Sequence, residues 1–115
     1  MKKHKTDLIR LKSPSILLLV FGYLSANTQV LYNNAIIDIT QGTFVTVEGS
    51  ALNTDSLSNM GNLYIDSNFV NNGNATGGGN YFVAGDWENN MVFTADTSTV
   101  ELNGANQLIK GSSVS

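Results

Sequence analysis

The chain has 115 residues, a formal net charge of −3, no cysteine and a single histidine, His4. Without cysteine it has no disulfide and no Cys-ligated metal or redox site. From Asn27 onward one basic residue, Lys110, stands against eight acidic residues, so this region has a net charge of −7. Such an acidic surface disfavours nucleic acid and anionic lipid as partners. The lack of histidine after residue 26 also excludes Ser-His-Asp catalysis and His-ligated zinc in this region.

Residues 1–26 have the pattern of a secretory signal peptide. Five of the six basic residues lie in the first twelve positions, a nine-residue apolar run extends from Ile16 to Leu24, and the small residues Ser25 and Ala26 follow. This order is typical of such a peptide, and the run is shorter than the roughly 20 residues that span a membrane in a helix. A buried amphipathic helix is the alternative, but the run is apolar on all sides. We therefore predict a signal-peptide helix over 1–26, cleaved after Ala26 or at a bond up to Gln29, with no transmembrane segment in the mature chain and export to the outer-membrane surface or the extracellular space.

The region 27–115 contains a repeat that predicts its fold. The segments VTVEG, LYIDS, YFVAG and VELNG end at Gly49, Ser67, Gly85 and Gly104, at intervals of 18, 18 and 19 residues. β-branched and aromatic residues dominate the apolar positions, and no long helical periodicity is present. One alternating apolar segment per copy is typical of stacked coils. We therefore predict an all-β fold, a short right-handed parallel β-solenoid with rungs of about 18–19 residues.

The alternation within each copy predicts which residues face the core, because residues two apart on a strand point to the same side. The predicted inward pairs are Val45 and Val47, Leu63 and Ile65, Tyr81 and Val83, and Val100 and Leu102. The predicted outward residues between them are Thr46, Tyr64, Phe82 and Glu101. A second core column is predicted after the corner and consists of Ala51, Phe69 and Trp87, with Asn106 as its member in the last copy.

Three asparagines follow the corner in register: Asn53, Asn71 and Asn89. An asparagine amide both donates and accepts hydrogen bonds, so stacked copies can form a ladder along the solenoid axis. The alternative is that they are ordinary loop asparagines; we predict the ladder. The segment 71–80 (NNGNATGGGN) contains three consecutive glycines, and we predict a flexible surface loop there.

The last part of the chain fits a longer pattern. Residues 84–111 read AGDWENNMVFTADTSTVELNGANQLIKG, which fits G-[DN]-W-x-N-N-x-x-F…S-T-V-x-[FL]-N-G…Q-x-I-x-G. The fitting residues are Asp86, Trp87, Asn89, Asn90, Phe93, Ser98, Thr99, Val100, Leu102, Asn103, Gly104, Gln107, Ile109 and Gly111. This pattern resembles repeats in large secreted surface proteins of Bacteroidota. The resemblance implies a large adhesin-like protein, of a kind that often carries a C-terminal signal for type IX secretion. Because the last repeat stops at Val114 and Ser115 without a recognisable cap or sorting domain, we expect the chain to be truncated at its C-terminal end and to belong to a longer protein with further repeats or domains.

The only catalytic candidates are carboxylates. Asp86 and Glu88 flank Trp87, and a carboxylate pair beside an aromatic ring could hydrolyse a glycoside. However, other copies have neutral residues at both positions, and Trp87 falls in a core column. We therefore expect solvated surface carboxylates, no catalytic residue and no enzyme activity.

Oxygen ligands for calcium also occur near successive corners, at Asp66, Asn68, Asp86 and Asn103. No calcium-loop motif accompanies them. A structural calcium site is thus conceivable, but we predict no metal site and no cofactor.

Together these patterns indicate an exported structural or adhesin-like segment that binds an extracellular glycan or surface protein through a repetitive polar face. Tyr64 and Phe82 are the best candidates for contacting a sugar ring, although they could instead stack on each other. The alternatives are the N-terminal part of a β-helix polysaccharide lyase or hydrolase, and a spacer that binds nothing.

Overall fold

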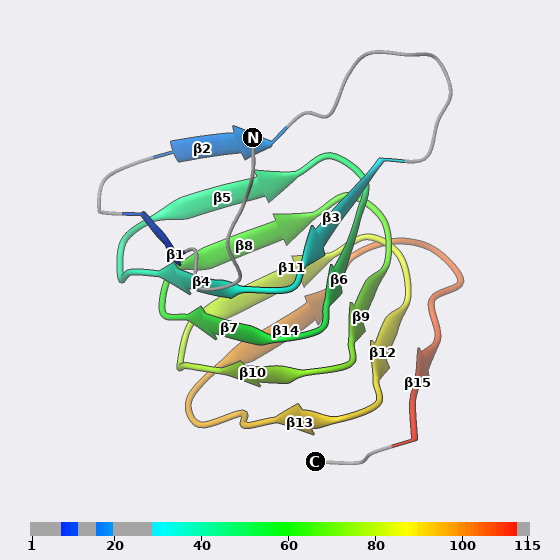
Figure 1. The fold of residues 1–115 in the computed structure, drawn as a ribbon. Coiled ribbons are helices and arrows are strands. Elements are labelled where there is room, and N and C mark those ends of the chain that lie inside the picture. The colour runs from blue at the N-terminus through cyan, green and yellow to red at the C-terminus, as the bar shows by residue number, and fades with distance from the viewer. Residues whose placement is uncertain (1–7, 12–15, 20–28, 113–115) are drawn as a thin grey trace.

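A computed structural model describes residues 8–11, 16–19 and 29–112, and these residues form a coil of short strands with no helix (Figure 1). Each turn of the coil adds one strand to each of three parallel sheets, which we call sheets A, B and C. The predicted all-β parallel solenoid is therefore confirmed.

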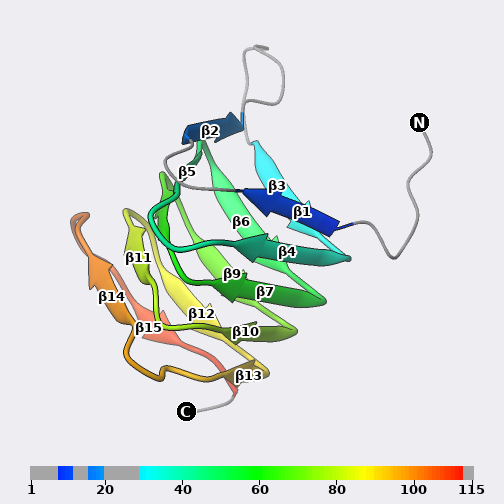
Figure 2. The same cartoon turned by 90° about the vertical axis from the view of Figure 1, so that its left-hand side faces the viewer.

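The strands follow one another in the order sheet A, sheet B, sheet C. Sheet A contains β1 (Leu8–Leu11), β4 (Ile36–Ile39), β7 (Ser56–Asn59), β10 (Asn74–Thr76) and β13 (Val92–Phe93). Sheet B contains β2 (Ile16–Leu19), β5 (Phe44–Val47), β8 (Asn62–Ile65), β11 (Asn80–Val83) and β14 (Thr99–Leu102). Sheet C contains β3 (Val30–Asn33), β6 (Ser50–Asn53), β9 (Phe69–Asn71), β12 (Trp87–Asn89) and β15 (Ile109–Lys110). Figure 2 shows the turns stacked as a pile, with β1–β3 at one end and β13–β15 at the other.

The register of sheet B matches the repeat in the sequence. Val45 pairs with Leu63, Leu63 with Tyr81, and Tyr81 with Val100, so the strand spacing is 18, 18 and 19 residues. The inward pairs on β5, β8 and β11 are buried, and those on β14 are partly buried because no described strand lies beyond it. The alternation rule thus predicted the core side of every strand in this sheet from β5 onward.

Aromatic rings fill the core between the C-terminal turns. Phe69 and Tyr81 are fully buried, and Trp87 is 7% exposed. The ring centroid of Phe69 lies 4.8 Å from that of Trp87, and Phe93 lies 5.0 Å from Trp87 in an edge-to-face arrangement. Such contacts add about 0.5–1.5 kcal/mol to the burial of each ring. Trp87 is therefore a core residue, as its column predicted.

The predicted corner column is also present. The amide of Ser67 donates to the carbonyl of Gly49 at 2.9 Å, and the amide of Gly85 donates to the carbonyl of Ser67 at 2.8 Å. Ser67 is not among the residues with positive φ, so this corner accepts a side chain, whereas Gly49 has a φ of 138°. In the last turn Gly104 donates its amide to the side chain of Gln107.

Two predictions about the connections are wrong. Trp87 pairs with Ile109 and not with Asn106, because the segment between β14 and β15 is three residues longer than the segments between β8 and β9 and between β11 and β12. Asn106 lies in that segment, exposed, with a φ of 53°. Residues 71–80 are not a flexible loop: they contain the end of β9, all of β10 and the start of β11. Gly77 has a φ of 102° and a Cβ there would lie 2.3 Å from the carbonyl oxygen of Asn59, so this turn requires glycine.

The described parts of the predicted signal segment are strands, not a helix. β1 pairs with β4 and β2 pairs with β5, both in parallel. The predicted cleavage bond after Ala26 lies outside the described residues. In the part of the chain that the structure describes, no helix is long and apolar enough to cross a membrane.

Candidate functional site

A buried ladder of four asparagine amides runs along the solenoid between sheets C and A. Asn33 donates to Asn53 at 2.6 Å, Asn53 to Asn71 at 2.8 Å, and Asn71 to Asn89 at 2.7 Å, each from Nδ2 to Oδ1. The three predicted members are therefore confirmed as a ladder. The sequence analysis did not predict Asn33, because it lies 20 residues before Asn53 and not 18. The difference arises because four residues connect β4 to β5, whereas two connect β7 to β8.

The asparagine ladder also holds the start of each sheet A strand. The same Nδ2 groups donate to backbone carbonyls of the next turn: Asn33 to Ser56 at 3.0 Å, Asn53 to Asn74 at 3.0 Å, and Asn71 to Val92 at 2.8 Å. Ser56, Asn74 and Val92 are the first residues of β7, β10 and β13. The ladder thus couples the buried core to the backbone that presents the outer face of sheet A.

Four polar side chains form a rectangle on the outer face of sheet A, and we call this rectangle the polar grid. Ser56 pairs with Asn74, and Ser58 pairs with Thr76, across β7 and β10. Neighbouring strands are about 4.8 Å apart and outward residues on one strand about 6.6 Å apart. Asn74 is exposed and the other three are half-buried. None of the four side chains forms a hydrogen bond with another described residue, so water or a ligand must satisfy them.

The surroundings of the polar grid are partly apolar. Ile36, on β4, pairs with Ser56 and is 43% exposed, and Val92, on β13, pairs with Asn74 and is 47% exposed. Asp38 pairs with Ser58 and is half-buried. The outer face of sheet A therefore has an uncharged polar centre with an apolar residue at either end of one column.

The outer face of sheet B contains the predicted ligand-face residues, Tyr64 and Phe82, in direct register. Their rings stack with centroids 4.5 Å apart and an interplanar angle of 12°, and Phe44 stacks on the other side of Tyr64 at 6.5 Å. Both ring faces of Tyr64 are therefore directed at other rings. A sugar that stacks on an aromatic face would find only the outward faces of Phe44 and Phe82.

A pair of amides lies beside this aromatic stack. Asn80 donates from Nδ2 to Oδ1 of Asn62 at 2.9 Å. Part of the hydrogen-bonding capacity of sheet B is thus used within the protein, unlike that of the polar grid.

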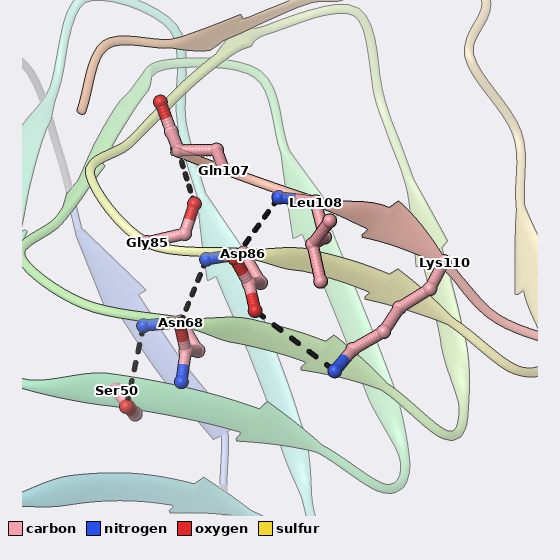
Figure 3. A network of polar contacts seen from close by, with 7 residues as sticks. All are labelled: Ser50, Asn68, Gly85, Asp86, Gln107, Leu108 and Lys110. Atoms are coloured by element: carbon pink, nitrogen blue, oxygen red, sulfur yellow. Dashed lines mark hydrogen bonds and ion pairs between the residues drawn. The ribbon is translucent and has the colours of Figure 1, made fainter. Parts of the chain in front are cut away.

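The outer face of sheet C contains a chain of polar contacts from turn to turn (Figure 3). The amide of Asn68 donates to Oγ of Ser50 at 3.3 Å, the amide of Asp86 donates to Oδ1 of Asn68 at 2.7 Å, and the amide of Leu108 donates to Oδ1 of Asp86 at 3.0 Å. Lys110 lies 3.9 Å from the other oxygen of Asp86. These side chains therefore link successive turns of the solenoid.

A shallow hollow of about 40 Å³ lies beside this polar chain, and Asp86, Glu88 and Lys110 are among the residues that line it. Its volume suits one or two waters and not a sugar ring. Trp87, between the two acids in sequence, points into the core and is not available to a ligand in this hollow.

The four oxygen-bearing residues considered for calcium lie in the segments between sheet B and sheet C strands. Asn68 and Asp86 are linked to each other through a backbone amide, as above, and Asp66 and Asn103 are exposed. Among the described residues, no group of three or more histidine, cysteine, aspartate or glutamate side chains could hold a metal ion.

The comparisons with known proteins add no assignment. Neither a protein-family model nor a characterised protein nor a solved structure matches this chain.

Proposed function

We propose that residues 27–115 form an exported β-solenoid segment with a structural and adhesive role, which binds a glycan or a protein at the cell surface through the outer face of sheet A. The observation that carries this proposal is the polar grid, whose four side chains form no hydrogen bond with the residues that the structure describes. By contrast, several polar groups and rings on the outer faces of sheets B and C contact one another. An adhesive face needs free hydrogen-bonding groups on a rigid support.

The charge distribution supports export. Basic residues are concentrated before residue 13, and the region from Asn27 onward is acidic. The resemblance of residues 84–111 to repeats in secreted surface proteins agrees with this destination. We propose that the protein reaches the outer-membrane surface or the extracellular space after cleavage near Ala26.

We propose no catalytic role for this segment. Glycoside hydrolysis requires one carboxylic acid and one carboxylate on opposite sides of a bound sugar. Asp86 accepts a backbone hydrogen bond and contacts Lys110, while Trp87 is buried. No histidine or cysteine occurs after residue 26.

Export and adhesion are tested separately. Sequencing the N-terminus of the protein recovered from the cell surface or medium should give a start between residues 27 and 30; an intact residue 1 would refute export. Binding of the full chain to an array of glycans and extracellular matrix proteins tests adhesion. Absence of binding to every member of both sets would leave only the structural role.

A further inference from the structure

The polar grid has a geometry that does not depend on a ligand. β7 is paired with β4 on one side and β10 on the other, and β10 is paired with β7 and β13. In the asparagine ladder, Asn33 and Asn53 donate hydrogen bonds to the backbone carbonyls of Ser56 and Asn74. Because these backbones are fixed on both sides, binding would order little more than the side-chain rotamers, which lowers its entropic cost.

The chemistry of the polar grid matches a neutral polyol. Three hydroxyls and one amide can each donate and accept hydrogen bonds, as sugar hydroxyls do, and the grid contains no ionisable group. The net negative charge of the region from Asn27 onward repels polyanions. The exposed side chains of Ile36 and Val92 provide apolar contacts for the C–H faces of sugar rings.

The longer dimension of this face runs along the solenoid axis. On the outer face of sheet A, β4, β7 and β10 each place two residues and β13 places one, whereas the column of Ile36, Ser56, Asn74 and Val92 crosses all four of these strands. Three strand spacings correspond to about 14 Å. An extended polymer that crosses the strands therefore meets four outward residues of the column, while one that runs along a strand meets two.

We infer that the polar grid binds an extended neutral polysaccharide that lies along the solenoid axis, with its hydroxyls on Ser56, Ser58, Asn74 and Thr76. This inference rests on the proposed adhesive function and narrows it to one ligand class and one orientation.

Affinity gel electrophoresis of the full 115-residue chain tests the inference. Native gels contain hydroxyethyl cellulose as a neutral polymer or polygalacturonate as an anionic polymer. We expect retardation by hydroxyethyl cellulose and none by polygalacturonate. The double variant Ser58→Ala/Thr76→Val should weaken the retardation at least tenfold, because it removes two of the three grid hydroxyls.

Thr46→Val is the matched control for Thr76→Val, because Thr46 is also half-buried on an outer face, that of sheet B. It should leave the retardation unchanged, and circular dichroism should show that all variants fold. Equal retardation of the double variant and the original chain would overturn the inference, as would no retardation by hydroxyethyl cellulose or a preference for polygalacturonate. If the inference fails but the double variant loses binding to a matrix protein on the array, the adhesive proposal stands with a protein as its ligand.

Discussion

The side-chain amide of Asn53 donates to Oδ1 of Asn71 at 2.8 Å and to the carbonyl of Asn74 at 3.0 Å. One buried group thus joins two turns of sheet C to the first residue of a sheet A strand. An unsatisfied buried polar group costs about 1–3 kcal/mol. Loss of one asparagine of the ladder should therefore also destabilise its neighbours, which lose their hydrogen-bond partner.

Asn71→Ala should lower the free energy of unfolding by about 2–4 kcal/mol, because the variant leaves the carbonyl of Val92 and the amide of Gly73 without their side-chain partner. Urea denaturation of the full chain measures this loss. Asn72→Ala is the matched control: Asn72 is exposed and its side chain accepts one hydrogen bond, from Asn90, so the change should stay below about 0.5 kcal/mol. Equal losses for the two variants would contradict a special role for the buried ladder.

Tyr81→Phe should stabilise the protein at neutral pH by about 1 kcal/mol, because Oη of Tyr81 is buried without a hydrogen-bond partner. Burial also raises the pKa of this phenol well above its ordinary value of 10.0, and the side chain of Asn59 opposes the rise without reaching hydrogen-bond geometry.

The same residue predicts a pH dependence. Above pH 10 the unfolded chain loses the Tyr81 proton while the folded chain retains it, so stability is present below this pH and falls as the pH rises further. Thermal unfolding of the original chain and Tyr81→Phe between pH 7 and 11 tests this. The difference between the two should grow in favour of phenylalanine above pH 10, and parallel curves would count against it.

Tyr64 and Phe82 should be energetically coupled. A double-mutant cycle with Tyr64→Ala and Phe82→Ala should give a coupling energy of about 0.5–1.5 kcal/mol in urea unfolding, because the rings stack on each other. A second cycle with Tyr32→Ala, an exposed residue on sheet C, and Phe82→Ala should give a value near zero. Coupling of the same size in both cycles would mean that the measured value does not report the ring contact.

Gly77→Ala should destabilise the protein by more than about 2 kcal/mol, because its φ of 102° strains an L residue and the new Cβ would meet the carbonyl of Asn59. Gly78→Ala is the control, since its closest neighbour is the hydroxyl of the exposed Thr97 and that side chain can rotate. Thermal unfolding compares the two. A larger loss for Gly78→Ala would show that the turn is governed by other contacts.

The sequence predicted sheet B well because its strands alternate clearly. Val45, Leu63 and Tyr81 recur at 18-residue intervals with a second apolar residue two positions later. In sheet A, strand β10 was missed because its apolar pattern is weak: it buries only Ala75 in the segment NAT. Gly-rich segments next to it therefore resembled a loop.

The candidate site was less predictable than the fold. Serine, threonine and asparagine occur throughout the chain, and only the folded structure separates those that bond to each other from those of the polar grid. Insertions also shift the register, as at Asn33 and Ile109, and a fixed period cannot reveal where they fall. The hydrogen bonds and the strand register are both difficult to predict for the same reason: they join residues about 18–22 positions apart.

The pairing of β12 with β15 covers two residues, whereas that of β5 with β8 covers four. Ile109 is 74% exposed, whereas Ala51, Phe69 and Trp87 in the same column are buried. Turns stacked along one axis bear a pulling force in series, so the weakest junction yields first. Under tension along the axis, the segment from Ile109 onward should detach as a unit at low force while the turns joined by the asparagine ladder remain closed.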